Sequence, residues 1–276
     1  MEEERLLGME LEIFASSLAL SLISLPLLAR RWQIKMWIAL SGAVVIGGLS
    51  GLIVSGINSA LTGLGIVPLA FIELLFIFSI TLSALVASFY RDPERTPPET
   101  ERVILSPADG AVVYVNRVER GSALVSTKGE RKYRLDEITD TDLLADAAYL
   151  VGINMNQLNV HVNRSPVEGR IILQKRIRGQ FISLRKQEAP TVNERVTTII
   201  DSGTFKIAVV QIASRLVRRI ASYLGEGDRV WIGQRIGMIR LGSQVDVAIP
   251  EIENLRINVK PGDEVRAGVS VIARYG

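Results

Sequence analysis

The sequence predicts a mostly β domain preceded by an α-helical transmembrane region. Three observations support this fold class. Long uncharged apolar runs are confined to the first 90 residues, short alternating runs follow them, and a Gly-Asp turn recurs near the C-terminus. We therefore divide the chain into a membrane anchor, residues 1–90, and a mostly β domain, residues 91–276.

Three apolar runs in the anchor approach the length of a membrane-spanning helix. Ile13–Ala29 carries no charge over 17 positions, Met36–Ile57 none over 22, and Ile66–Tyr90 only Glu73 over 25. About 20 residues cross the hydrocarbon core of a bilayer. The second and third runs are therefore expected to span it and the first is borderline, which gives two to three helices. Glu73 either has a function at membrane depth, sits near the interface or pairs within the helix bundle.

The distribution of basic residues predicts an orientation. The loop between the first two runs carries three basic residues, Arg91 and Arg95 follow the third run, and residues 58–65 between the second and third carry no charge. Basic loops stay in the cytoplasm. The β domain is therefore expected on the cytoplasmic side of the cell (inner/plasma) membrane.

Composition excludes several classes of chemistry. The chain has no cysteine, so disulfides, thiol nucleophiles and Cys-ligated zinc are excluded. Its one histidine, His161, argues against a histidine-rich metal site, and we expect no metal. A net charge of +3 suits an anionic membrane surface but is too small to indicate nucleic acid.

The region after residue 90 begins with a charged, Pro-rich segment, Arg91–Pro98, which we interpret as a linker. Short runs that alternate or are β-branched follow it. The predicted strands are Ala111–Val118, Tyr149–Ile153, Val160–Val162, Arg170–Leu173, Val196–Asp201, Phe205–Ile212 and Val245–Ile249. One helix is expected over Asp136–Ala147, with Thr139 or Asp140 as its cap.

An internal repeat refines the fold class. Gly227–Gly233 and Gly262–Gly268 share a Gly-Asp turn, a valine two residues later and a second glycine. This pattern resembles the paired turns of biotinyl/lipoyl carrier domains. The resemblance implies a barrel-sandwich of short strands with internal two-fold character. The alternative is two similar hairpin turns.

Five short motifs occur in an order that identifies a family. They are Phe89-Tyr90-Arg91-Asp92-Pro93, Ser106-Pro107-Ala108-Asp109-Gly110, Asn159-Val160-His161-Val162-Asn163-Arg164-Ser165-Pro166, Asn193-Glu194-Arg195 and Gly237-Met238-Ile239-Arg240-Leu241-Gly242-Ser243. From Phe89 to Gly276 the chain resembles the short form of the phosphatidylserine decarboxylases, which includes the archaetidylserine decarboxylases. Gln244 after the Gly-Ser pair fits the short form.

The resemblance implies an autocatalytic proenzyme that cleaves itself between Gly242 and Ser243. Ser243 would become a covalent pyruvoyl group, an electron sink for decarboxylating a serine phospholipid to its ethanolamine form. A serine hydroxyl needs a base, and His161 is the only imidazole available. Asp109 matches the family's motif position for the third member of a Ser-His-Asp triad.

The resemblance also implies partners. These are phosphatidylserine or archaetidylserine, the membrane, the chain's own two cleavage products and a second copy in a homodimer. Arg164 is a candidate for the substrate phosphate because it follows the His161 motif. Arg215, Arg218 and Arg219 are either a second candidate or a solvated basic face.

Two other functions remain open on the residues alone. A membrane-bound serine hydrolase could use Asp109, His161 and Ser243, although a second glycine is missing after Ser243. A membrane-anchored biotinyl-like carrier would explain the Gly-Asp repeat, but the β region has no Met-Lys pair to carry the cofactor.

Overall fold

The chain folds into two compact units, Met1–Phe89 and Tyr90–Gly276, in a computed structural model. The structure describes residues 2–32, 34–61, 64–98, 100–119, 139, 147–184, 189–213, 220–240 and 243–276. Each unit is considered by itself below.

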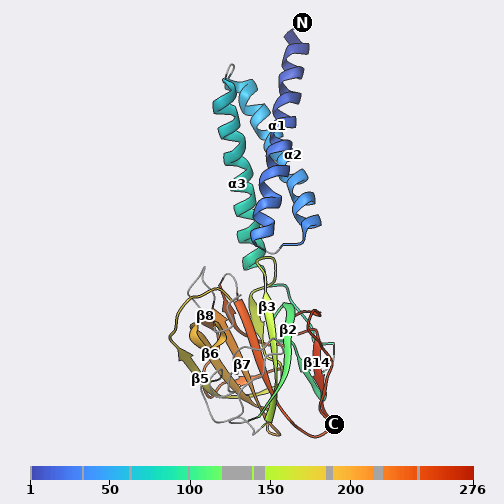
Figure 1. Cartoon of the computed structure of the whole chain (residues 1–276), viewed down its shortest axis with the longest axis vertical. Coiled ribbons are helices and arrows are strands. Elements are labelled where there is room, and N and C mark those ends of the chain that lie inside the picture. The colour runs from blue at the N-terminus through green and yellow to red at the C-terminus, as the bar shows by residue number, and fades with distance from the viewer. Residues whose placement is uncertain are drawn as a thin grey trace, which may run out of the picture. The chain divides into compact units, whose positions relative to one another are not determined.

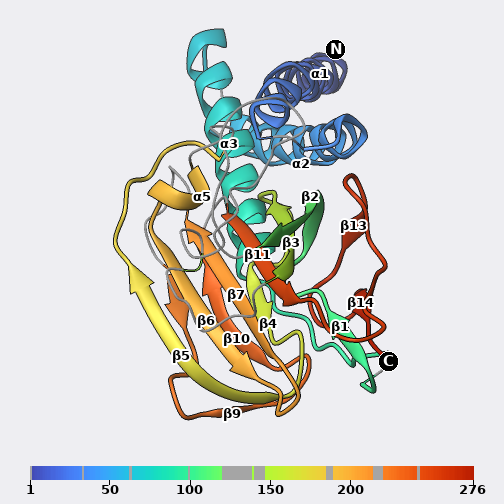
Figure 2. The same ribbon diagram turned by 60° about the horizontal axis from the view of Figure 1, so that its bottom comes forward.

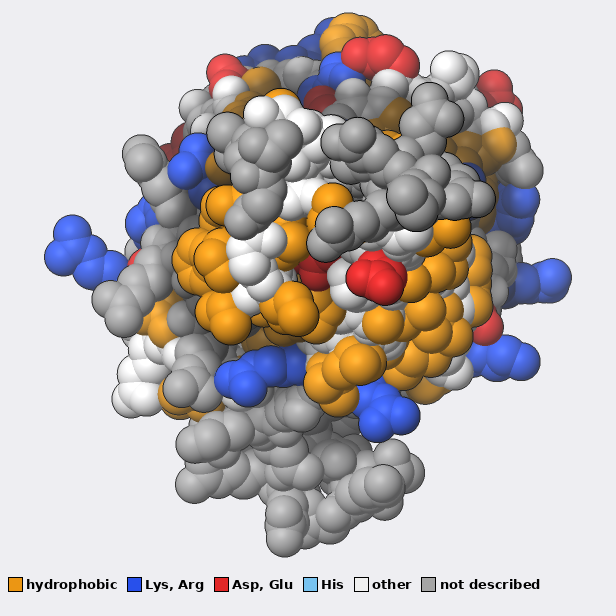
Figure 3. All heavy atoms as spheres, turned by 90° about the horizontal axis from the view of Figure 1, so that it is seen from above, with side chains coloured by type: hydrophobic (Ala, Val, Ile, Leu, Met, Phe, Trp, Pro, Cys, Tyr) orange, Lys and Arg blue, Asp and Glu red, His pale blue; other side chains and the backbone are white. Residues whose placement is uncertain are grey.

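Three helices form the first unit (Figure 1): α1 Glu2–Arg31, α2 Met36–Leu61 and α3 Ile66–Tyr90. Each contains a segment long and apolar enough to cross a membrane. Many large hydrophobic side chains face outward, and apolar side chains dominate the described surface of this unit seen from its end (Figure 3). Such a surface is stable only against an apolar medium or a partner.

Glycines allow close contact between α1 and α2. A Cβ atom at Gly47 would lie 2.2 Å from Ser21 Oγ and 3.0 Å from Leu18 Cα, and one at Gly51 would lie 3.0 Å from Phe14 Cα. Small residues four apart let helix backbones approach, as their spacing suggests. The Ser21 hydroxyl also donates to the carbonyl of Ala43, at 2.8 Å.

Glu73 lies inside the helical unit. Its side chain is 2% exposed and accepts a hydrogen bond from the Ser16 hydroxyl at 2.5 Å. The carboxyl group is thus paired within the bundle, which was one of the expected alternatives.

The second unit is built from antiparallel strands in three sheets (Figure 2). The large curled sheet has the order β13-β2-β3-β11-β7-β6-β5-β9, and the small sheets have the orders β1-β14-β12 and β4-β10-β8. The strands are β1 Val103–Leu105, β2 Gly110–Glu119, β3 Ala147–Met155, β4 Val162–Arg164, β5 Gly169–Ile177, β6 Arg195–Asp201, β7 Lys206–Ala213, β8 Ile220–Ser222, β9 Arg229–Val230, β10 Arg235–Ile239, β11 Ser243–Pro250, β12 Arg256–Ile257, β13 Glu264–Val265 and β14 Val271–Arg274, with one short helix, α5 Ala189–Val192.

Both faces of the large sheet are apolar, and strand β11 shows why. Val245, Val247 and Ile249 point into the larger core cluster, whereas Ala248 belongs to a second cluster on the opposite face. Successive side chains of a strand point to opposite faces. Strand β11 is therefore buried on both sides, although its second face also carries the buried polar residues Gln244 and Asp246.

The predicted strands agree with the observed ones at six of seven positions. The exception is Val160–Val162, because β4 begins only at Val162 and runs to Arg164. The backbone before it is held by other contacts: Val160 N–H donates to the side chain of Asp109. Of the predicted helix over Asp136–Ala147, Thr139 is helical, but Ala147 already begins β3. The rest lies outside the described residues, as does the arginine cluster at 215–219.

A second repeat, which we did not predict, relates the two halves of the β unit. Ser106–Gly110 and Ser165–Gly169 share the pattern Ser-Pro-x-x-Gly. The N–H of Leu105 donates to the carbonyl of Pro166, and the N–H of Arg164 donates to the carbonyl of Pro107, both at 2.9 Å. Each serine hydroxyl also donates to the carbonyl two residues on, at 2.7 and 2.6 Å. These reciprocal bonds are those of a local two-fold arrangement.

The Gly-Asp turns obey the same two-fold relation. Residues 227 and 228 exchange backbone hydrogen bonds with Ile171 of β5, and residues 262 and 263 exchange the equivalent bonds with Val112 of β2, all at 2.8 to 2.9 Å. All four glycines of the two turns have positive φ. The turns thus occupy equivalent places in two halves of one unit. The comparison with biotinyl/lipoyl domains stays a prediction.

Candidate active site

Position 243 is held in the middle of the large sheet. Ser243 begins β11, and its backbone lies opposite Met155 of β3 on one side and Ala213 of β7 on the other. Gly242 lies outside the described residues. The peptide bond expected to be cut therefore immediately precedes a strand that has neighbours on both sides.

The carboxylate of Asp109 is buried among four donors. Two come from the guanidinium of Arg95, which contacts both carboxylate oxygens at 2.5 and 2.8 Å. The other two are backbone N–H groups, those of Ala267 at 2.8 Å and Val160 at 3.4 Å. The Asp109 contact is also the main cause that raises the pKa of Arg95. The paired guanidinium fixes the orientation of the carboxylate.

Gly110 is required by the turn that presents Asp109. Its φ is 151°, and a Cβ atom there would lie 2.2 Å from the carbonyl oxygen of Asn154. Only glycine fits this close approach of two strands.

The equivalent residue in the other half of the unit has a different environment. Glu168 occupies the place of Asp109 in the second Ser-Pro turn, and it pairs with Arg229 at 3.0 Å. The side chains of this pair are 48% and 65% exposed, against 8% and 10% for Asp109 and Arg95. One copy of the turn thus carries a surface ion pair, and the other carries a buried one.

His161 is fully buried, and its ring is oriented by the backbone. Its Nδ1 atom lies 2.9 Å from the carbonyl oxygen of Asn159. A carbonyl oxygen only accepts, so in the neutral ring Nδ1 carries the hydrogen and Nε2 the lone pair. Burial lowers the pKa of His161 to about 4, although the Asn159 carbonyl and the charge of Asp109 act to raise it. The imidazole is therefore neutral at pH 7.

The structure brings two of the three predicted catalytic residues together. Asp109 bonds to the N–H of Val160, next to His161, and acts on the imidazole through its charge. The carbonyl of His161 accepts the N–H of Ile239, four residues before Ser243. The chain that leads to the cleavage site thus passes beside His161. The role of each residue in catalysis stays a prediction.

Residues 91–95, which we interpreted as part of a linker and call the strap, are bound to the β unit by their side chains. Arg91 donates to the carbonyl of Leu158 at 2.5 Å, Arg95 holds Asp109, and Asp92 accepts from Arg235 and Arg164. Arg95 is the site residue that sequence reasoning missed. Its only signal was its place two residues after the first family motif.

Arg164 is buried in contacts with the protein. Its side chain is 4% exposed and donates to the carbonyls of Gly233 and Pro93, at 3.1 and 3.0 Å, and to Asp92 at 3.1 Å. These contacts join the strap to one of the two Gly-Asp turns. Its role as a phosphate ligand stays a prediction, and its contacts favour a structural role.

Asn193 of the fourth motif fastens the segment before β6 to the end of β7. Its amide exchanges hydrogen bonds with Ile182, at 2.9 and 3.0 Å, and donates to the carbonyl of Ala213 at 2.9 Å. Ala213 is the β7 neighbour of Ser243. The motif therefore supports the strand next to the cleavage site.

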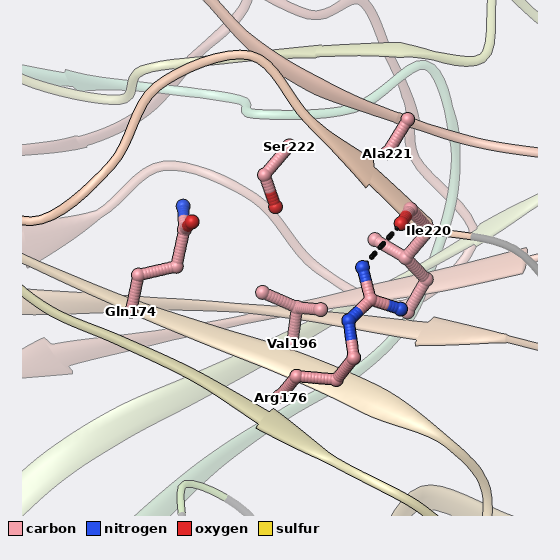
Figure 4. A pocket seen from close by; sticks show the side chains of 6 residues that line it. All are labelled: Gln174, Arg176, Val196, Ile220, Ala221 and Ser222. Carbon is pink, nitrogen blue, oxygen red and sulfur yellow. Dashed lines mark hydrogen bonds between the residues drawn. The ribbon is translucent and has the colours of Figure 1, made fainter.

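A pocket of about 390 Å³ opens between β5, β6 and β8 (Figure 4). It is lined by Gln174, Arg176, Val196, Ile220, Ala221 and Ser222. The guanidinium of Arg176 donates to the carbonyl of Ile220 at 2.5 Å and to Glu194 at 2.7 Å. Its charge is thus already balanced by a carboxylate.

Comparison with known proteins gives one family. Residues 82–273 match the phosphatidylserine decarboxylase family model. A provisionally named archaetidylserine decarboxylase proenzyme of Methanocaldococcus jannaschii is 42% identical over 185 residues, which cover 67% of this chain and 87% of the relative. A similarly named protein of Methanothermobacter thermautotrophicus is 36% identical over 218 residues, 76% of this chain and 92% of the relative.

A bacterial relative adds a second named substrate. The phosphatidylserine decarboxylase proenzyme of Chlorobium limicola is 35% identical over 199 residues, which cover 72% of this chain and 83% of the relative. The family model covers the strap, both Ser-Pro turns, His161 and Ser243. This chain belongs to the phosphatidylserine decarboxylase family.

Proposed function

We propose that this chain cuts itself between Gly242 and Ser243 and then removes the carboxyl group of a serine-headed phospholipid. Membership of the decarboxylase family supports the reaction. The observation that carries the proposal is the buried, neutral His161 beside the Asp109 carboxyl group, with its carbonyl bonded to the segment that leads to Ser243.

Self-cleavage needs only groups of the chain and one water. The hydroxyl oxygen of Ser243 attacks the carbonyl carbon of Gly242, and the amide becomes an ester with release of the Ser243 amine. Loss of the α-proton of Ser243 then expels the Gly242 carboxylate and leaves a dehydroalanine. Addition of water to this residue releases ammonia and leaves the pyruvoyl group at position 243.

His161 is the proposed base for these proton transfers. Its Nδ1–H group is committed to the Asn159 carbonyl, so its lone pair is on Nε2. A pKa of about 4 keeps the ring ready to accept a proton at neutral pH. Asp109, held by Arg95, stabilises the imidazolium that forms.

The surroundings of position 243 fit a pyruvoyl group. After the cut this position would be the first residue of a strand paired on both sides, which would hold the new group in place. When present, the pyruvoyl group supplies an electron sink for the loss of carbon dioxide. His161 is also our candidate for returning a proton to the product.

The substrate and the membrane geometry belong to the same proposal. The relatives act, by their names, on archaetidylserine or phosphatidylserine, and we infer one of these serine phospholipids here. The three apolar helices would tether the β unit to the bilayer that contains the substrate and raise the local substrate concentration. Basic loops favour a cytoplasmic β unit. We also propose the biotinyl/lipoyl-type barrel-sandwich and a homodimer.

The test uses purified wild-type protein and Ser243→Ala with a serine phospholipid labelled at its carboxyl carbon. Wild type should release labelled carbon dioxide and lose activity with hydroxylamine, which attacks a pyruvoyl ketone. Ser243→Ala should be uncut and inactive. Retained activity in Ser243→Ala would exclude the mechanism. Inactivation by a fluorophosphonate instead of hydroxylamine would indicate the serine hydrolase.

A further inference from the structure

A buried polar cluster lies at the beginning of β11, on the face opposite Val245. The hydroxyl of Tyr114 donates to Asp246 Oδ2 at 2.7 Å. The side-chain amide of Gln244 donates to Asp246 Oδ1 at 2.7 Å and to the Tyr114 oxygen at 3.0 Å. Asp246 is completely buried and Gln244 is 5% exposed. The three side chains thus bond to one another in a network that the proposed mechanism does not use.

Glycine 152 makes this network possible. It lies on β3, directly opposite Tyr114 of β2 on one side and Asp246 of β11 on the other. A Cβ atom at position 152 would lie 2.4 Å from Cζ of the Tyr114 ring. The ring therefore crosses over the glycine, and its hydroxyl reaches the carboxyl group two strands away.

The cluster joins the two products of the proposed self-cleavage. Tyr114 and Gly152 lie in the larger product, and Gln244 and Asp246 lie in the smaller one, one and three residues from its new end. A chain end that has lost its covalent neighbour frays unless side chains hold it. A reactive group at that end must still keep its position within about 1 Å.

We propose that Tyr114, Gln244 and Asp246 are positioning residues that lock the new end of β11 onto β2 after the chain is cut. This inference rests on the proposed self-cleavage. The cluster fixes register as well as attachment. A slip of β11 by two residues would keep its apolar alternation but would break all three hydrogen bonds.

The chemistry of Asp246 supports a specific role over simple packing. Within the described part of the chain, Asp246 accepts hydrogen bonds from Tyr114 and Gln244, which are both neutral, and burial raises the pKa of its carboxyl group to about 6. A buried carboxyl group without a cation is costly to keep. An apolar residue at this position of β11 would pack into the same face more cheaply, but it would not select the register.

The test removes one hydroxyl group in two backgrounds. Tyr114→Phe keeps the ring over Gly152, and it is made in the wild-type chain and in the uncut Ser243→Ala chain. We measure cleavage by intact mass, amide hydrogen exchange in residues 244–250, and the kinetic constants of the cut enzyme. Tyr114→Phe should be cut completely. Exchange should rise in the cut protein only, and kcat should fall about tenfold with KM unchanged.

Tyr149→Phe is the matched control. Tyr149 lies on β3 opposite Ile249 and packs against the larger core, outside the cluster. Loss of its hydroxyl should leave exchange and kcat unchanged. Asp246→Asn repeats the test with a nearly isosteric change, should Tyr114→Phe fail to fold.

Two results would overturn the proposal. An equal rise of exchange in cut and uncut proteins, with kcat unchanged, would make the cluster a general packing feature. A wild-type protein that is active as one uncut chain would remove the proposed function, and this inference with it. The mass measurement distinguishes these cases before any kinetic comparison.

Discussion

Asp109 and Glu168 occupy equivalent places in the two Ser-Pro turns, yet only Asp109 is buried with its cation. A surface pair such as Glu168–Arg229 contributes little to stability, because water screens both charges. The Asp109–Arg95 pair contacts the backbone beside His161 and is shielded from water. The comparison assigns a positioning role to Arg95, which fixes the carboxylate next to the imidazole.

Arg95→Ala should slow self-cleavage by roughly 10- to 100-fold, because a misplaced catalytic group loses most of its effect. Pulse-labelled protein made by cell-free translation in detergent gives the cleavage rate directly. Arg229→Ala, which removes the cation paired with Glu168 in the other half, should be cut at the wild-type rate. Equal rates for both variants would show that the Asp109 pair has no part in cleavage.

The lowered pKa of His161 predicts a pH profile for self-cleavage. The ring is neutral in the folded chain down to about pH 4, whereas in the unfolded chain it binds a proton below pH 6.5. The cleavage rate should therefore be flat between pH 8 and about pH 5.5 and be halved only near pH 4. A rate halved near pH 6.5 would mean that the base is an exposed group.

The same shift affects stability. The folded chain binds fewer protons than the unfolded chain between pH 6.5 and about pH 4, so this contribution of His161 is complete above pH 6.5 and is lost as the pH falls toward 4.

Protonation of Asp246 changes stability with pH in the opposite direction. Its pKa is about 6 in the folded chain and 3.8 in the unfolded chain, so its contribution is complete below pH 3.8 and is lost as the pH rises through 6. We compare Asp246→Asn with its parent in the uncut Ser243→Ala chain. As the pH rises from 4 to 7, the difference in the free energy of unfolding should shift in favour of Asp246→Asn by up to roughly 3 kcal/mol, because only the parent loses stability. Urea unfolding at several pH values measures this difference. Parallel curves for the two proteins would contradict it.

At the scale of elements, contact between α1 and α2 depends on glycine. Gly47→Ala would place a methyl group 2.2 Å from Ser21 Oγ and should cost about 1–3 kcal/mol through overpacking. SDS titration followed by helical circular dichroism measures the loss. Gly56→Ala is the control, because no atom lies within 4 Å of the added carbon. An equal effect of both substitutions would mean that the helices do not pack through Gly47.

Local pattern predicted the elements but not the contacts that set the site. Apolar runs gave α2 and α3, and alternation gave β2 and β11, because burial imposes a period on the sequence. The strap was interpreted as a linker because of its charged, Pro-rich composition. The ion pair Arg95–Asp109 that binds it to the β unit follows no periodicity and could not be predicted from local pattern. The Ser-Pro repeat was missed for a related reason. Its two copies share only three residues, and their equivalence lies in backbone hydrogen bonds.

At the scale of the whole molecule, self-cleavage would not separate the two products easily. The smaller product, residues 243–276, contributes β11 between β3 and β7, β14 between β1 and β12, and β13 beside β2. Backbone hydrogen bonds of four strand pairs, β11–β3, β11–β7, β14–β1 and β13–β2, would hold it to the larger product. The active form is therefore expected to be a complex of two chains that carries its membrane helices on the larger one.

Intact mass spectrometry of the purified, active wild-type protein tests the central claim most directly. The proposed cut predicts two chains, residues 1–242 and a 34-residue chain from position 243. The smaller chain should be blocked at its N-terminus and should have the mass of a pyruvoyl group in place of serine. A single uncut chain of 276 residues in an active preparation would contradict the account.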